Sequence, residues 1–170
     1  MTSKKFLFVL KFLMIFLTII ACYVNAWPQH AGTCDVQKVD SSPHAGDNGK
    51  NIVQGDGGFK ITVSKESDDY HIKLDGSEPI HGILVYVEDN KGTRFGEFAL
   101  DDNKLLQYKS CGGTGEHNTI THTSKDPKNL PLELKWKPGD TSFDEATVHS
   151  VVVLNFTRWF HLEDVKFKSS

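Results

Sequence analysis

The chain has 170 residues, with 19 lysines and arginines against 22 aspartates and glutamates, a formal net charge of −3. This mildly acidic balance argues against nucleic acid or an anionic membrane surface as the main partner, because both attract basic faces. The length suits one domain with one substantial core.

The first 26 residues have the pattern of a secretory signal peptide. A charged start precedes an apolar run over 6–23, which is broken once by Lys11, and small residues follow at 24–26. The uninterrupted part of the run, 12–23, is short for a bilayer span of about 20 residues. We therefore expect cleavage after Ala26 and no stable membrane insertion afterwards. The alternative is an uncleaved signal anchor.

Removing residues 1–26 takes away three lysines and no acidic residue, which leaves 16 basic against 22 acidic residues and a net charge of −6. No second apolar run of spanning length follows. The sequence therefore predicts a secreted, extracellular protein with a single domain over residues 27–170.

The exported part begins with a polar segment, 27–54, which is rich in Gly, Ser, Asp and Asn and predicts an irregular N-terminal arm. The run at 83–87 is continuously apolar, as a central strand covered on both faces would be. The longest β-rich run is 148–156. Shorter segments with alternating or β-branched residues predict further strands near 59–63, 70–74, 98–100, 106–108, 119–123 and 132–136.

Turn-forming sequences such as Asp75-Gly76 and Pro138-Gly139-Asp140 separate these segments. The predicted strand centres recur every 10–14 residues, and no amphipathic helix of useful length interrupts them. This spacing is typical of an all-β fold, an immunoglobulin-like antiparallel β-sandwich.

Two cysteines, Cys34 and Cys111, remain after the leader, which contains Cys22. An even number in an exported chain predicts a disulfide, which would attach the N-terminal arm to the sandwich. The bond would close a span of 77 residues. The chain-entropy model gives such a bond about 4–5 kcal/mol of stabilisation. Two free thiols are the alternative.

The eight histidines do not follow a metal-binding pattern: the sequence has no His-Glu-x-x-His and no Cys-x-x-Cys. His117 and His122 are five apart, so on one strand they would point to opposite faces. We therefore expect solvated or hydrogen-bonded histidines and no cofactor. Pairs of adjacent acidic residues, such as Asp101-Asp102, occur at turns and predict solvated corners instead of the separated carboxyl groups of a glycosidase.

The glycine-dense stretch 111–115 could suggest a phosphate-binding loop, which needs a helix N-terminus to supply backbone amides. A strand is predicted to follow instead. We interpret the stretch as a flexible turn that lets Cys111 reach the arm. The Gly-x-Ser-x-Gly motif of many serine hydrolases is absent.

Asn155-Phe156-Thr157 is an N-glycosylation sequon, and the alternation along its strand predicts that Asn155 faces solvent. The three tryptophans are either core residues or sugar-stacking platforms. Trp136 is in phase with Leu134, which predicts a core position. Trp159 and Trp27 are the candidate binding residues, and Trp159 is the better surface candidate.

The order of several short motifs resembles the Reeler (reelin-type) domain of secreted and extracellular proteins. The resemblance covers roughly residues 30–160. Its motifs are Cys34 and then Pro43-His44, the strand 59–64, the segment 80–89, Gly96-Glu97-Phe98, Cys111 with 121–124, 135–138, and 151–157 with Trp159.

The resemblance implies a domain that is not known as an enzyme and that occurs in extracellular matrix, cell guidance and, in insects, defence and recognition of microbial surfaces. We expect a secreted, non-catalytic binding, adhesion or recognition module for an extracellular protein or a surface glycan. One alternative, motivated by the histidines and tryptophans, is a metal-dependent or carbohydrate-active secreted enzyme. Another is a secreted defence or effector factor.

Overall fold

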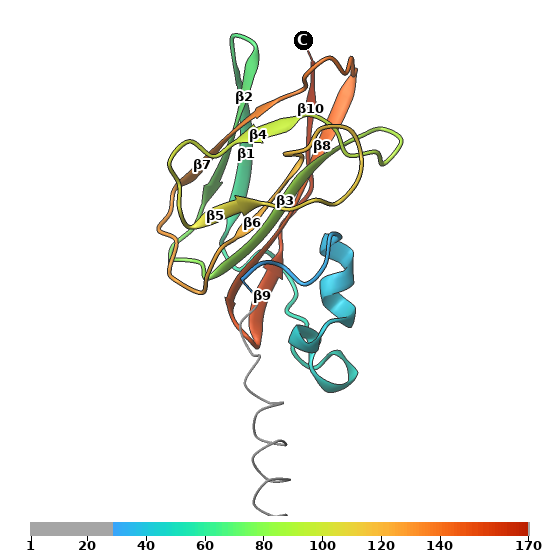
Figure 1. Ribbon diagram of the computed structural model, residues 1–170. Helices are drawn as coiled ribbons and strands as arrows, with labels where there is room; N and C mark the ends of the chain where they lie inside the picture. Colours follow the sequence, from blue (N-terminus) through green and yellow to red (C-terminus); the bar gives the residue numbers. More distant parts are fainter. Residues whose placement is uncertain (1–28, 170) are drawn as a thin grey trace, which may run out of the picture.

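The computed structural model describes residues 29–169, so the expected leader and Trp27 lie outside the described part of the chain. Two antiparallel sheets face each other across one main core, and the N-terminal arm lies against the outside of one of them (Figure 1). The expected all-β sandwich is confirmed. Within residues 29–169, no helix has the length and apolar character that crossing a membrane requires.

The smaller sheet has four strands in the order β1-β2-β7-β4. Their bounds are β1 (Lys60–Glu66), β2 (Asp69–Asp75), β7 (Leu132–Lys137) and β4 (Glu97–Ala99). Strand β7 shows why the sequence forms this sheet: Leu132, Leu134 and Trp136 are buried, and the residues between them are exposed. This alternation turns every second side chain toward the other sheet.

The larger sheet has the order β10-β8-β3-β6-β5. Its strands are β10 (Val165–Lys168), β8 (Glu145–Asn155), β3 (Gly82–Asp89), β6 (Thr119–His122) and β5 (Leu106–Tyr108). Strand β9 (Arg158–His161) pairs with the end of β8 that β10 leaves unpaired. Because β3 occupies the other edge of β8, β9 and β10 follow one another along the same edge.

Strand β3 is covered on both faces, as its continuous apolar run predicted. Ile83, Val85 and Val87 belong to the core between the two sheets. Leu84 and Tyr86 point the other way, into a second apolar cluster beneath the N-terminal arm. The arm therefore supplies the cover that a helix supplies in many other sheets.

The N-terminal arm is more regular than expected. It contains three short 3₁₀ helices, η1 (Val36–Ser41), η2 (Pro43–Ala45) and η3 (Asp47–Gly49). The Asp35 side chain caps η1 by accepting from the Gln37 amide, and Ser42 caps η2 in the same way. Val36, Val39 and Ala45 are buried against the sheet. These few apolar residues, scattered in a polar sequence, carry no clear periodicity, which is why sequence alone predicted an irregular segment.

The C-terminal edge also differs from expectation, because neither β9 nor β10 was predicted. The two strands are only four residues long each, and residues 162–164 separate them. Strand β8 ends at Asn155, so Phe156 lies in the turn and is 45% exposed instead of continuing the apolar face of the strand.

Candidate functional site

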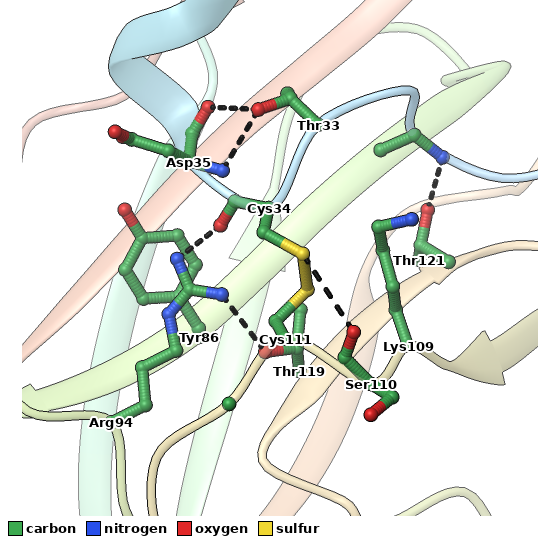
Figure 2. The surroundings of a disulfide bond; sticks show 12 residues. Thr33, Cys34, Asp35, Tyr86, Arg94, Lys109, Ser110, Cys111, Thr119 and Thr121 are labelled. Atoms are coloured by element: carbon green, nitrogen blue, oxygen red, sulfur yellow. Dashed lines mark hydrogen bonds between the residues drawn. A yellow bond between two sulfur atoms is a disulfide. The ribbon is translucent and has the colours of Figure 1, made fainter.

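A disulfide joins Cys34 to Cys111, with 5.5 Å between the two Cα atoms, as expected from the sequence. It links the start of the arm to the glycine-rich loop that follows β5. Two features lie next to the disulfide. One is a group of contacts around Arg94 and Tyr86 that holds the arm, which we call the clamp, and the other is a hollow bordered by the loop. Figure 2 shows the surroundings of the disulfide.

Arg94 is the centre of the clamp. Its guanidinium lies over the Tyr86 ring, 3.6 Å from the ring centroid, while Nη2 donates to the carbonyl of Cys34 and Nη1 donates to Thr119 Oγ1 at 3.3 Å (Figure 2). Nε lies 3.6 Å from a carboxylate oxygen of Glu88. Only 9% of the residue is exposed. A desolvated guanidinium is stable only where such partners surround it. Through these contacts Arg94 holds the arm against the larger sheet, next to the glycine-rich loop.

Tyr86 contributes a second link to the arm, because its hydroxyl accepts a hydrogen bond from the Val36 amide at 3.5 Å. Burial raises the pKa of Tyr86 above its ordinary value of 10.0, and the nearby charge of Glu88 acts in the same direction. The bond from the Val36 amide and the charge of Arg94 oppose that change. The phenol is therefore held in its neutral form.

Trp159 anchors the other end of the arm. Its side chain is fully buried, at 0% exposure, and Nε1 donates to the carbonyl of His44 at 3.0 Å. The expectation that Trp159 is a surface platform for sugars is therefore wrong: the arm covers an indole that the sheet alone would leave exposed. Trp136 is buried in the main core, as expected.

The glycine-rich loop is exposed over residues 112–116 but is held by hydrogen bonds and one close backbone approach, which differs from the flexible turn that the sequence suggested. Asn118 Nδ2 donates to the carbonyls of Gly112 and Gly115, at 2.6 and 2.9 Å. A Cβ on Gly113 would lie 2.4 Å from the carbonyl oxygen of Arg94, and φ there is +86°. Glycine is thus required for close approach to the segment that carries the clamp.

The same loop borders a hollow of about 510 Å³ beside the disulfide. Tyr108 and His117 line it as a stacked pair, with ring centroids 3.8 Å apart and planes inclined by 12°. Ser110 and Glu116 add a hydroxyl and a carboxylate to its wall. Rings, polar groups and exposed glycine backbone therefore share one open surface.

A second hollow, of about 260 Å³, lies on the outer face of the smaller sheet and is lined by His71, Asp101, Glu133 and Lys135 among others. Lys135, Asp101 and His71 in its lining already have partners within the protein. Lys135 Nζ lies 3.2 Å from Asp101, and His71 lies 3.5 Å from Glu66. This hollow is therefore the weaker candidate.

Several histidines are hydrogen-bonded or paired with carboxylates, as expected. His149 lies between Glu88 and Asp164, and His161 lies 3.0 Å from Asp40 on the arm. In the part of the chain that the structure describes, no three His, Cys, Asp or Glu side chains are grouped so that they could hold a metal ion. Asn155 is exposed at the end of β8.

Comparison with known proteins identifies a family for the chain as a whole. The Reeler domain model matches residues 28–169. Two crystal structures of the human F-spondin reeler domain superpose with TM-scores of 0.53 and 0.51, each at 13% identity, and cover 68% and 69% of this chain and 91% and 96% of those chains. At this identity the superposition shows the fold alone.

A Xenopus laevis protein named "Putative ferric-chelate reductase 1" is 35% identical over 78 residues, which are 44% of this chain. The matched part spans 13% of the length of that protein.

Proposed function

The chain belongs to the Reeler domain family, and from that premise we propose that it is a secreted, non-catalytic recognition module whose ligand is a surface glycan. The signal-peptide pattern of residues 1–26 and the Cys34–Cys111 disulfide support the export part of this proposal. The family supports an extracellular setting.

The observation that carries the glycan part is the hollow beside the glycine-rich loop. Its volume of about 510 Å³ suits a short oligosaccharide, since small-ligand sites span about 300–1,000 Å³. The disulfide at Cys111 and the hydrogen bonds from Asn118 hold its wall in place. A wall that is already ordered loses little conformational entropy when a ligand binds.

The chemistry of the wall favours a sugar. The stacked Tyr108–His117 pair offers an apolar ring surface, and the Glu116 carboxylate and Ser110 hydroxyl offer hydrogen-bonding partners for sugar hydroxyls. Glu116 also disfavours strongly anionic glycans. The ligand class is therefore a neutral or amino-bearing oligosaccharide.

One broad face of the sandwich is covered by the arm, and the other carries a set of exposed ion pairs. The arm covers the outer side of β3 and β8, and salt bridges cross the outer side of the smaller sheet, such as Lys73 to Asp75 at 2.9 Å and Lys137 to Asp69 at 3.1 Å. The loop hollow lies outside both faces. This arrangement supports a role for the loop in binding the ligand. The core of the sandwich then serves to hold the loop in position.

The proposal is tested with the secreted mature protein on an array of neutral, amino-bearing and anionic oligosaccharides. We expect binding to members of the first two groups, weakened at least tenfold by His117→Ala and by Glu116→Gln. His71→Ala is the matched control, because this histidine lies at the other hollow, and it should leave binding unchanged. Mass spectrometry of the bound oligosaccharides after incubation should show them intact.

Absence of binding to every oligosaccharide would contradict the glycan part of the proposal. So would binding that depends on His71 and not on the loop. Cleavage of a bound oligosaccharide would contradict the non-catalytic part and favour a carbohydrate-active enzyme. Capture of a cell-surface protein that the loop variants abolish, with no oligosaccharide bound, would favour a protein ligand.

A further inference from the structure

The turn between β8 and β9 is an exposed hairpin tip that carries the sequon. Asn155 pairs with Arg158 across the turn, and residues 155–158 are all exposed. Arg158 is held in turn by Glu78, with N–O distances of 3.2 and 2.7 Å. The tip is therefore ordered and still accessible to a large enzyme.

The Asn155 side chain is oriented by the third residue of its own sequon. Its Oδ1 accepts from the backbone amide of Thr157 at 3.0 Å and from Thr157 Oγ1 at 3.2 Å. The amide nitrogen, which forms the bond to the sugar, is not used in either contact. The folded protein thus accommodates this side chain at the surface without burying the atom that a glycan would occupy.

Phe156, between these two residues, is one of the few large apolar side chains that the described structure leaves exposed, at 45%. Its ring centroid lies 5.1 Å from that of His44 on the arm, and its carbonyl lies 3.1 Å from His44 Nδ1. The Phe156–His44 ring pair is therefore a surface contact at the point where the arm meets the hairpin.

We propose that Asn155 carries an N-linked glycan and that this glycan covers the Phe156–His44 ring pair where the arm meets the hairpin. A glycan is bulky and polar and is attached one residue from the exposed ring, so its first sugars lie within reach of both rings. The inference rests on the export part of the proposed function and not on the glycan-binding part.

Occupancy is measured on the protein secreted from a eukaryotic cell, by mass before and after treatment with peptide N-glycosidase. We expect the wild-type mass to fall on treatment and Asn155 to be converted to Asp. Asn155→Gln and Thr157→Val should lack the added mass, whereas Thr157→Ser keeps the sequon and should retain it. In a parallel sample, an established secretion leader replaces residues 1–26. This sample supplies secreted protein for the same measurement even if residues 1–26 do not direct secretion in the host cell.

Cover of the ring pair is measured by the rate at which diethyl pyrocarbonate modifies His44. The glycan should slow this reaction several-fold relative to enzymatically deglycosylated wild type and to Asn155→Gln. His71, on the other sheet, should react at the same rate in all samples. A secreted wild-type protein without the added mass would overturn the site, and equal His44 rates would overturn the cover.

Discussion

The guanidinium carbon of Arg94 lies 3.6 Å from the centroid of the Tyr86 ring, and the same guanidinium donates a hydrogen bond to the carbonyl of Cys34. Arg94 therefore links the backbone at Cys34 to Tyr86 on β3, in addition to the covalent bond that joins Cys34 to Cys111 in the glycine-rich loop. Together with Trp159 at the far end, this contact makes the arm part of the folded domain.

Replacing Arg94 with Met should lower the free energy of unfolding by about 2–4 kcal/mol, because the change removes a desolvated cation–π contact and leaves the Cys34 carbonyl without this donor. Urea unfolding measures the effect. Arg158→Met is the matched control, since Arg158 forms an exposed salt bridge with Glu78, and it should cost less than about 1 kcal/mol. Equal losses would show that the clamp has no special role.

Replacing both Cys34 and Cys111 with Ser should cost about 4–5 kcal/mol on the chain-entropy model, yet leave the arm in place in the native state. The contacts of Arg94, Tyr86 and Trp159 remain in that variant. The fluorescence contribution of Trp159, obtained by difference from Trp159→Phe, reports on the arm. A red shift under native conditions would mean that the disulfide alone holds the arm.

Adding a methyl group to the glycine-rich loop should have very different effects at two neighbouring positions. Gly112 and Gly113 both have positive φ, +76° and +86°, but only at Gly113 would the new Cβ meet the Arg94 carbonyl, at 2.4 Å. Gly112→Ala should cost about 1–2 kcal/mol. Gly113→Ala should cost at least about 2 kcal/mol more in urea unfolding. Similar costs would indicate that the loop does not pack against the clamp segment.

Tyr86 should make the stability fall at alkaline pH. Because its pKa is raised in the folded state, the unfolded chain loses the phenol proton first, and the folded state then holds more protons. The contribution of this group is thus fully present below pH 10.0 and is lost as pH rises from there through the folded-state pKa. The free energy of unfolding of wild type, minus that of Tyr86→Phe, should be flat below that pH and decline above it. A flat difference throughout would contradict the prediction.

Local patterns were sufficient to predict the sandwich. The alternation in β2 and β7, the continuous apolar run of β3 and the turn sequences between strands each depend on neighbouring residues only. The disulfide was predictable because just two cysteines follow residue 26. The edge strands β9 and β10 were missed because segments of four residues contain too few positions to show a period.

The candidate site was less predictable, since its members come together from distant segments. No spacing in the sequence indicates that Arg94 will meet Cys34, or that the glycines will pack against the Arg94 backbone. The stacked pair of Tyr108 and His117 comes from the two sides of the loop and also has no local signal.

Trp159 is the clearest example of a residue whose environment the sequence did not predict and the tertiary structure did show. The sequence predicted the β-rich run 148–156 just before it, because strand periodicity is a local property, but not β9, which carries Trp159. Whether its indole faces solvent depends on a segment more than 100 residues away, since the His44 carbonyl accepts from its Nε1 over a separation of 115 residues. The sequence by itself determined the sandwich, except for its edge strands β9 and β10, and the disulfide. Only the tertiary structure decided that Trp159 is covered, because its burial is set by a contact with a distant part of the chain.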